Sequence, residues 1–195
     1  MALVFSLCSA PDNHIAFLHA QLASSRCYLE GKVPDLPVVK RSLMDKLFGR
    51  KKPISLPDGW PTQPPTLAKI DVNENNVGLY HRILNQGTDG VDGAGSLFQS
   101  WFLPHHSALM LDETGRNCAF YHQQLTELIS LLKRITPATV QSQFIAWCDA
   151  DPKMSQPTAD EVFELFCDFK RLHDFVTKAS KHQHGLVWVG RAANE

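Results

Sequence analysis

The longest regular pattern of apolar residues lies near the end of the chain, between Thr158 and Ser180. Apolar side chains recur there at steps of three and four residues, which places them on one face of a helix. Thr158 and Glu161 have the spacing of a capping box, in which each side chain bonds the other residue's backbone N–H. The pattern predicts a long helix that buries one stripe across the core. The stripe consists of Val162, Leu165, Phe166, Phe169, Leu172 and Val176.

Phe163 falls outside this stripe, on the side of Asp174 and Lys178. Its ring is therefore either covered by a second element or exposed to solvent. We favour the covering element, because an exposed ring is the rarer arrangement.

Short apolar runs at both ends of the chain predict strands. Residues 2–8 are apolar and stop before Pro11, and Leu186–Val189 follows the helix breaker Gly185. The first run has no basic segment before it, so we interpret it as a strand rather than a signal peptide. No run approaches the ~20 apolar residues that cross a membrane. If both runs join one sheet, the apolar character of both ends is explained.

Four further helices are predicted from apolar periodicity and capping residues. They run from Ser9 or Asp12 to near Gly31, from Asp71 or Asn73 to Gln86, from Asn117 to Arg134, and from Thr136-Pro137 through Trp147. The sequence thus predicts an α+β fold with a small mixed sheet, which includes the N-terminal and C-terminal strands and is covered by four to five helices. We expect residues 1–195 to form a single domain.

Two stretches have the composition of loops. Residues 49–66 contain five prolines, and residues 87–96 are rich in glycine. Trp60 lies in the first loop, where an aromatic ring either folds back on the core or forms an exposed anchor for a partner. Asp89 and Asp92 lie in the second, but the alternate ligands and closing Glu of a calcium loop are absent. We expect a flexible turn there.

Charge and cysteine usage narrow the possible partners. Lys and Arg number 19 against 20 Asp and Glu, a net charge of −1, so no broad positive field is available for a polyanion. We therefore expect neither a nucleic-acid nor a membrane partner. The five cysteines are odd in number and scattered, which indicates free thiols in a cytoplasmic protein.

Candidate chemistry is sparse. Cys118 and His122 are four residues apart and would share a face of the predicted helix, as a thiolate–imidazole pair requires. His105 and His106 are adjacent, and His182 and His184 are two apart, but neither spacing is that of a zinc site. No Gly-x-Ser-x-Gly motif and no phosphate-binding glycine loop is present. We expect no metal and no cofactor.

Three segments resemble the YfbM-like family of small bacterial proteins. They read IDVNENNVGLYHRILNQG (residues 70–87), ITPATVQSQF (135–144) and FELFCDFKRLHDFVTKASKHQHGLVWV (163–189). The resemblance implies an α+β fold. The family has no established activity, and its members occur in bacterial toxin–immunity gene neighbourhoods. The resemblance therefore implies a protein partner, a cognate toxin.

Our leading hypothesis for function is a non-catalytic cytosolic binding protein, in particular an immunity protein that neutralises a toxin by occlusion. The expected contacts are aromatic and histidine side chains on irregular segments. They are Trp60, Trp101, Phe102, His105 and His106. The alternative is a small hydrolase or transferase that uses His105 and His106, or the pair Cys118–His122.

Overall fold

The computed structural model describes residues 2–36, 55–65, 68–73, 77–84, 108–112 and 117–192. The second half of the proline-rich loop lies within these ranges. The glycine-rich loop at 87–96, with Asp89 and Asp92, lies outside them.

The strands form one sheet in which the two ends of the chain are neighbours. Their order is β2-β1-β5-β4-β3, and β1 pairs with β5 antiparallel from Leu3↔Ala192 to Ala10↔Gly185. The strands are β1 (Ala2–Ala10), β2 (Ala68–Asn73), β3 (Leu109–Met110), β4 (Asn117–Phe120) and β5 (Gly185–Ala192). The strands predicted at both ends are thereby confirmed.

Every strand pair within the described ranges is antiparallel, where the sequence was expected to give a mixed sheet. The chain leaves the sheet after Phe120 and enters β5 at Gly185, and Phe120 pairs with Leu186. The intervening helices therefore return the chain to the end of the sheet that it left, which makes β4 and β5 antiparallel.

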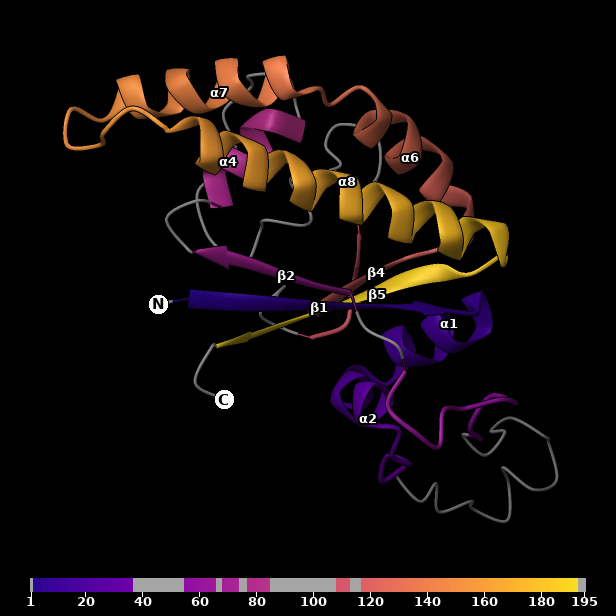
Figure 1. Ribbon diagram of the computed structural model, residues 1–195. Helices are drawn as coiled ribbons and strands as arrows, with labels where there is room; N and C mark the ends of the chain where they lie inside the picture. Colours follow the sequence, from indigo (N-terminus) through magenta and orange to yellow (C-terminus); the bar gives the residue numbers. More distant parts are fainter. Residues whose placement is uncertain are drawn as a thin grey trace, which may run out of the picture.

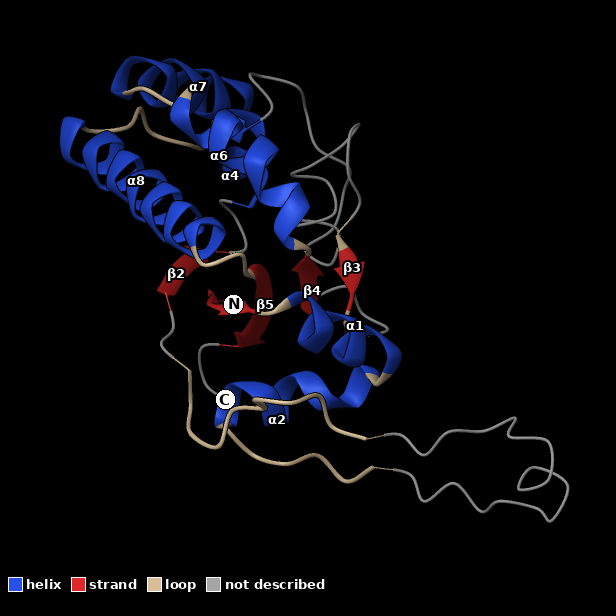
Figure 2. Ribbon diagram, turned by 90° about the vertical axis from the view of Figure 1, so that its right-hand side faces the viewer, coloured by secondary structure: helices blue, strands red, loops and turns tan. Residues whose placement is uncertain are grey.

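Helices cover both faces of this sheet (Figure 1). On one face lie α4 (Val77–Leu84), α6 (Leu125–Lys133), α7 (Pro137–Ala150) and α8 (Ala159–Lys181), and on the other lie α1 (Asp12–Ala20) and α2 (Ser25–Glu30). Figure 2 shows the same layers after a quarter turn. The fold is α+β, as predicted.

The central strand β5 is buried on both faces, which explains its unbroken apolar run. Leu186 and Trp188 belong to the core beneath the helical layer of α4, α6, α7 and α8, whereas Val187 and Val189 belong to the core beneath α1 and α2. In register, Trp188 lies between Leu7 of β1 and Cys118 of β4, and all three side chains are fully buried. Successive residues of a strand point to opposite faces, so each core receives alternate residues.

The long helix α8 begins and packs as predicted. The Glu161 N–H donates to Thr158 Oγ1 (3.2 Å), and the Thr158 N–H donates to Glu161 Oε2 (2.7 Å). Five members of the apolar stripe are buried and Phe166 is partly buried against the same core. Phe163, however, is 65 % exposed, so the expected covering element does not lie over it.

Three helix predictions need correction. Residues 117–120 are strand β4, and the helix begins only at Leu125, because Cys118, Ala119 and Phe120 are all buried between the layers as a paired strand. Asp71 and Asn73, which were expected to cap a helix, lie in the edge strand β2 (Ala68–Asn73). The helix α4 begins at Val77 instead. The helix predicted to end at Gly31 is interrupted at Gln21 and resumes as a short helical turn and α2.

We predict that Leu172→Ala lowers the free energy of unfolding by about 2–5 kcal/mol, because it opens a cavity in the core under α8. The matched control is Phe163→Ala on the same helix. Because the Phe163 ring is exposed, this change should lower the free energy of unfolding by no more than about 0.5 kcal/mol. Urea unfolding measures both. Equal losses in the two variants would show that the stripe is not the buried face.

Candidate functional site

Trp101, Phe102, His105 and His106 lie outside the described residues. Their assignment as partner contacts, and the use of the two histidines in the alternative hypothesis, stay predictions.

Trp60 is not an exposed anchor. It is 9 % exposed, and its ring packs edge-on against Phe17 and Tyr28 at centroid distances of 5.2 and 5.0 Å. The indole N–H donates to the carbonyl of Lys32 (2.9 Å). Because both the apolar ring and its one polar atom find partners inside the protein, Trp60 holds residues 55–65 against the α1–α2 face. Of the two alternatives, the ring folded back on the core is the one found, and the assignment of Trp60 to partner binding stays a prediction.

A buried histidine completes this attachment. His14 Nδ1 lies 3.0 Å from the Tyr28 hydroxyl, and Nε2 lies 2.8 Å from the Asp58 carbonyl oxygen. Gly31 has a φ of +64°, and a Cβ there would overlap the backbone of Gln63. The segment 55–65 follows α2 closely in Figure 2. Both ring nitrogens of His14 serve this contact, which gives it a structural role.

Cys118 and His122 do not share a helical face. Cys118 lies in β4, and its thiol is fully buried. Burial, and secondarily the nearby Asp112 carboxylate, raise the pKa of this thiol well above its usual range. His122 lies beyond the strand, where its backbone N–H donates to Asp12 Oδ1 (2.9 Å). A protonated thiol is a poor nucleophile, so the geometry does not support the predicted pair.

His182 and His184 lie together at the end of α8, with ring centroids 6.3 Å apart. Partial burial and then the charge of His182 lower the pKa of His184. Within the described ranges, no group of three or more His, Cys, Asp or Glu side chains is placed to hold a metal ion.

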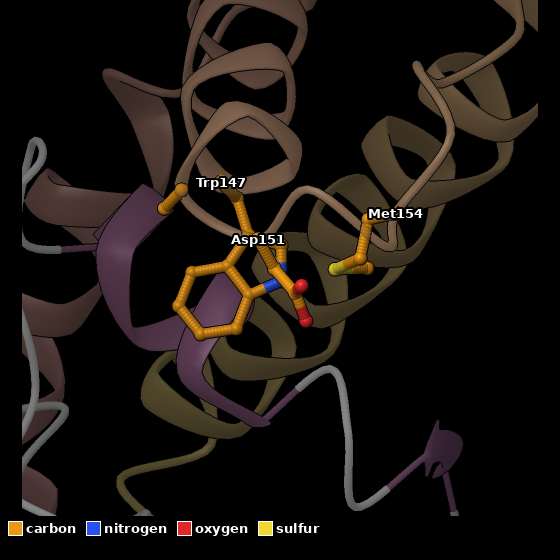
Figure 3. Close-up of a pocket in the computed structure, with 4 residues that line it drawn as sticks. Trp147, Asp151 and Met154 are labelled. Atoms are coloured by element: carbon orange, nitrogen blue, oxygen red, sulfur yellow. The ribbon is translucent and has the colours of Figure 1, made fainter.

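The candidate site is a cavity of about 490 Å³ where α7 ends and the chain turns toward α8. Its described lining consists of Trp147, Ala150, Asp151 and Met154. Figure 3 shows the Asp151 carboxylate and the Met154 sulfur directed toward the space beside the indole of Trp147. We refer to it as the α7–α8 cavity.

Local turn chemistry positions these residues. Asp151 has extended backbone angles (φ −122°, ψ 109°) and ends α7, while its carbonyl accepts from the Met154 N–H (2.9 Å). The Asp151 side chain accepts from the Lys153 N–H through Oδ1 (3.0 Å). The Asp151 N–H in turn donates to the carbonyl of Cys148 (3.2 Å). The turn is therefore fixed by hydrogen bonds on both sides of Asp151, and it brings Met154 back beside the helix.

Trp147 is held from the other side by α4. A Cβ at Gly78 would overlap the six-membered ring of Trp147, so only glycine permits this approach of the two helices. The indole Nε1 is buried and has no hydrogen-bond partner among the residues that the structure describes. Buried donors without a partner are rare in folded proteins and each needs a reason.

The surroundings of the cavity are acidic. Between residues 149 and 164 there are five acidic side chains and a single lysine, whereas the whole chain is almost neutral. All five acids are exposed: Asp149, Asp151, Asp160, Glu161 and Glu164. The carbonyl end of α7 adds a partial negative charge at the same place.

A second, smaller cavity of about 300 Å³ lies among α4, α6 and α7. Ile83, Leu84, Leu131 and Ile135 supply apolar walls, and Gln143 at its edge already accepts a hydrogen bond from Arg82 Nε (3.0 Å). Its polar groups are thus partly engaged within the protein, so we give the α7–α8 cavity priority.

Sequence reasoning missed the α7–α8 cavity. The sequence predicts that Trp147 lies in the helix that begins at Thr136-Pro137, and no motif marks Asp151 or Met154. Two signals were available: Trp147 and Asp151 are four residues apart, which places them on one side of a helix end, and acidic residues are concentrated in the connection.

The fold and site define an α+β protein with an antiparallel sheet, helices on both faces and a cavity at the outer end of the helical layer. No family model and no curated protein matches the chain. Among solved structures it is similar to a protein of unknown function, YfbM from Escherichia coli, with 15 % identity and a TM-score of 0.44. The match covers 97 % of this chain and 99 % of that one. Among the described helices, none is both long and apolar enough to cross a membrane.

We predict that Cys118 reacts with a thiol reagent only when the protein unfolds, because its thiol is buried and protonated. Cys27 and Cys167 are partly exposed and should react in the native protein. Mass spectrometry of peptides after timed labelling distinguishes the sites. Labelling of Cys118 as fast as that of Cys167 would restore it as a candidate nucleophile.

Proposed function

We propose that this chain is a non-catalytic binding protein whose protein partner docks at the α7–α8 cavity. The observation that carries the proposal is the convergence of an indole, a thioether and a carboxylate on one cavity of about 490 Å³. Aromatic and methionine side chains are enriched where proteins bind one another, and the volume lies in the usual range for binding sites.

The lining favours recognition over chemistry. Paired acid–base catalysis uses two convergent ionisable groups, and a weak nucleophile is commonly activated by an adjacent base. The described lining of the cavity offers one ionisable group, Asp151, beside apolar side chains. A partner side chain seated there would bury the indole and the thioether and pair with the carboxylate.

In its specific form, the proposal is that the protein acts in the cytosol as an immunity protein, and that its partner is a bacterial toxin neutralised by occlusion. This partner is proposed because the sequence resembles a family whose members occur in toxin–immunity gene neighbourhoods. The acidic connection supports docking by charge, since surface charges steer a partner of opposite sign.

The test is coexpression with a candidate toxin from a neighbouring gene, with survival and complex formation measured together. Ala150→Trp fills the cavity from an exposed position of α7 and should weaken the complex at least tenfold. The matched control, Ile145→Trp, lies on the same helix outside the cavity lining and should bind like the wild type. Trp101→Ala and Phe102→Ala test the remaining predicted anchors.

Melting temperatures within a few degrees of the wild type establish that each variant folds. If Ala150→Trp protects and binds as well as Ile145→Trp, the cavity is not the docking site and the proposal fails. If His106→Ala abolishes protection while the complex persists, catalysis replaces occlusion.

A further inference from the structure

We infer that the α7–α8 cavity takes an arginine side chain of a polypeptide partner. The inference rests on the proposed function and names the chemistry that the site recognises. Three features carry it: the charge around the cavity, the face of Trp147, and the position of Asp151 at a helix end.

The charge around the cavity selects a cation. Five exposed acids against one lysine between residues 149 and 164 give this stretch an excess of negative charge in an otherwise nearly neutral chain. The partial negative charge at the carbonyl end of α7 adds to it. An acidic or phosphorylated partner would be repelled at the same place, so the sign of the occupant follows from the site.

The indole of Trp147 selects a flat cation with an apolar stem. Tryptophan is the best aromatic partner for a cation over its face, and a guanidinium group also stacks on it as a planar group. Met154 and Ala150 offer apolar surface to the methylene groups of the stem. Because Gly78 fixes the ring against α4, the stacking surface exists before the partner arrives.

Asp151 supplies the paired charge. Its Oδ1 accepts from the Lys153 N–H, which fixes the carboxylate while its second oxygen and remaining lone pairs stay able to accept. Arginine donates through a planar fork that matches a carboxylate, whereas lysine presents a single ammonium. Arginine therefore satisfies the carboxylate and the indole together, and lysine satisfies them less well.

The experiment is a nuclear magnetic resonance titration of the full chain with the capped tripeptide acetyl-Gly-Arg-Gly-amide. The probe is the indole N–H signal of Trp147, which is assigned by its absence from Trp147→Phe. The matched ligand is the same tripeptide with citrulline, which keeps the shape of arginine and lacks its charge. We expect a saturable shift with the arginine peptide, weakened by added salt, and no saturable shift with the citrulline peptide.

Asp151→Asn keeps an acceptor for the Lys153 N–H and removes the charge, so it should fold normally and bind the arginine peptide about tenfold more weakly. Asp35→Asn, which alters an exposed acid elsewhere in the chain, should bind like the wild type. Equal shifts with citrulline, an unmoved Trp147 signal, or undiminished binding by Asp151→Asn would each overturn the inference.

The two proposals fail separately. If Ala150→Trp loses its protein partner while the arginine peptide leaves Trp147 unmoved, the cavity docks a protein by other chemistry and only the arginine inference falls. If the arginine peptide binds through Asp151 while Ala150→Trp keeps its partner, the cavity accepts an arginine side chain but not one from that partner, and the docking proposal falls.

Discussion

The structure depends on the pairing of the last strand between the first strand and β4. At the centre of this arrangement Trp188 lies between Leu7 and Cys118, and its ring meets Phe120 edge-on at 6.2 Å. The backbone groups of a central strand hydrogen-bond to the strand on one side or to the strand on the other. β5 therefore supplies hydrogen-bond partners to both β1 and β4. The sheet is therefore incomplete until residues 185–192 are in place, although β1 begins at residue 2.

The two-sided burial of β5 divides the molecule into two functional parts. Beneath α1 and α2, the core is closed by residues 55–65, which Trp60 and His14 attach through hydrogen bonds to backbone carbonyls. On the opposite face, α7 and α8 extend over the sheet, and the cavity lies at the turn that joins the end of α7 to the start of α8 (Figure 1). The candidate site thus lies on the end of α7 and the turn that follows it, and the contact of Gly78 with Trp147 fixes its indole.

The long and strongly periodic parts of the fold could be predicted from the sequence. The capping box at Thr158 and the apolar stripe of α8 combine two independent signals, and Thr136 caps α7 through its own side chain. The short strands β2 and β4 could not be recognised, because four to six residues carry too little periodicity and their pairing partners are distant in the chain. Because Cys118 lies in a strand, its spacing of four residues from His122 does not place the two side chains on one face of a helix.

The candidate site was harder to predict than the fold. Trp60 stands out in the sequence because prolines surround it. In the structure its indole N–H donates to the Lys32 carbonyl, and its ring packs against one aromatic ring from α1 and one from α2. These partners are distant in the sequence, so the contacts could not be predicted from it. Trp147 belongs to the apolar face of α7, and only the turn after Asp151 converts that face into the wall of a cavity. Whether an apolar helix face forms the wall of a cavity depends on the spatial position of the helix end, which the sequence pattern does not specify.

Native-state amide hydrogen exchange measures the central claim most directly, since it reports the opening free energy of each strand. The amides of Val187 and Trp188 should exchange only with the free energy of global unfolding measured by urea on the same protein, and those of the two-residue edge strand β3 should exchange with less. If the β5 amides instead open at a lower free energy than those of α7, the sheet does not depend on the last strand and the account is contradicted.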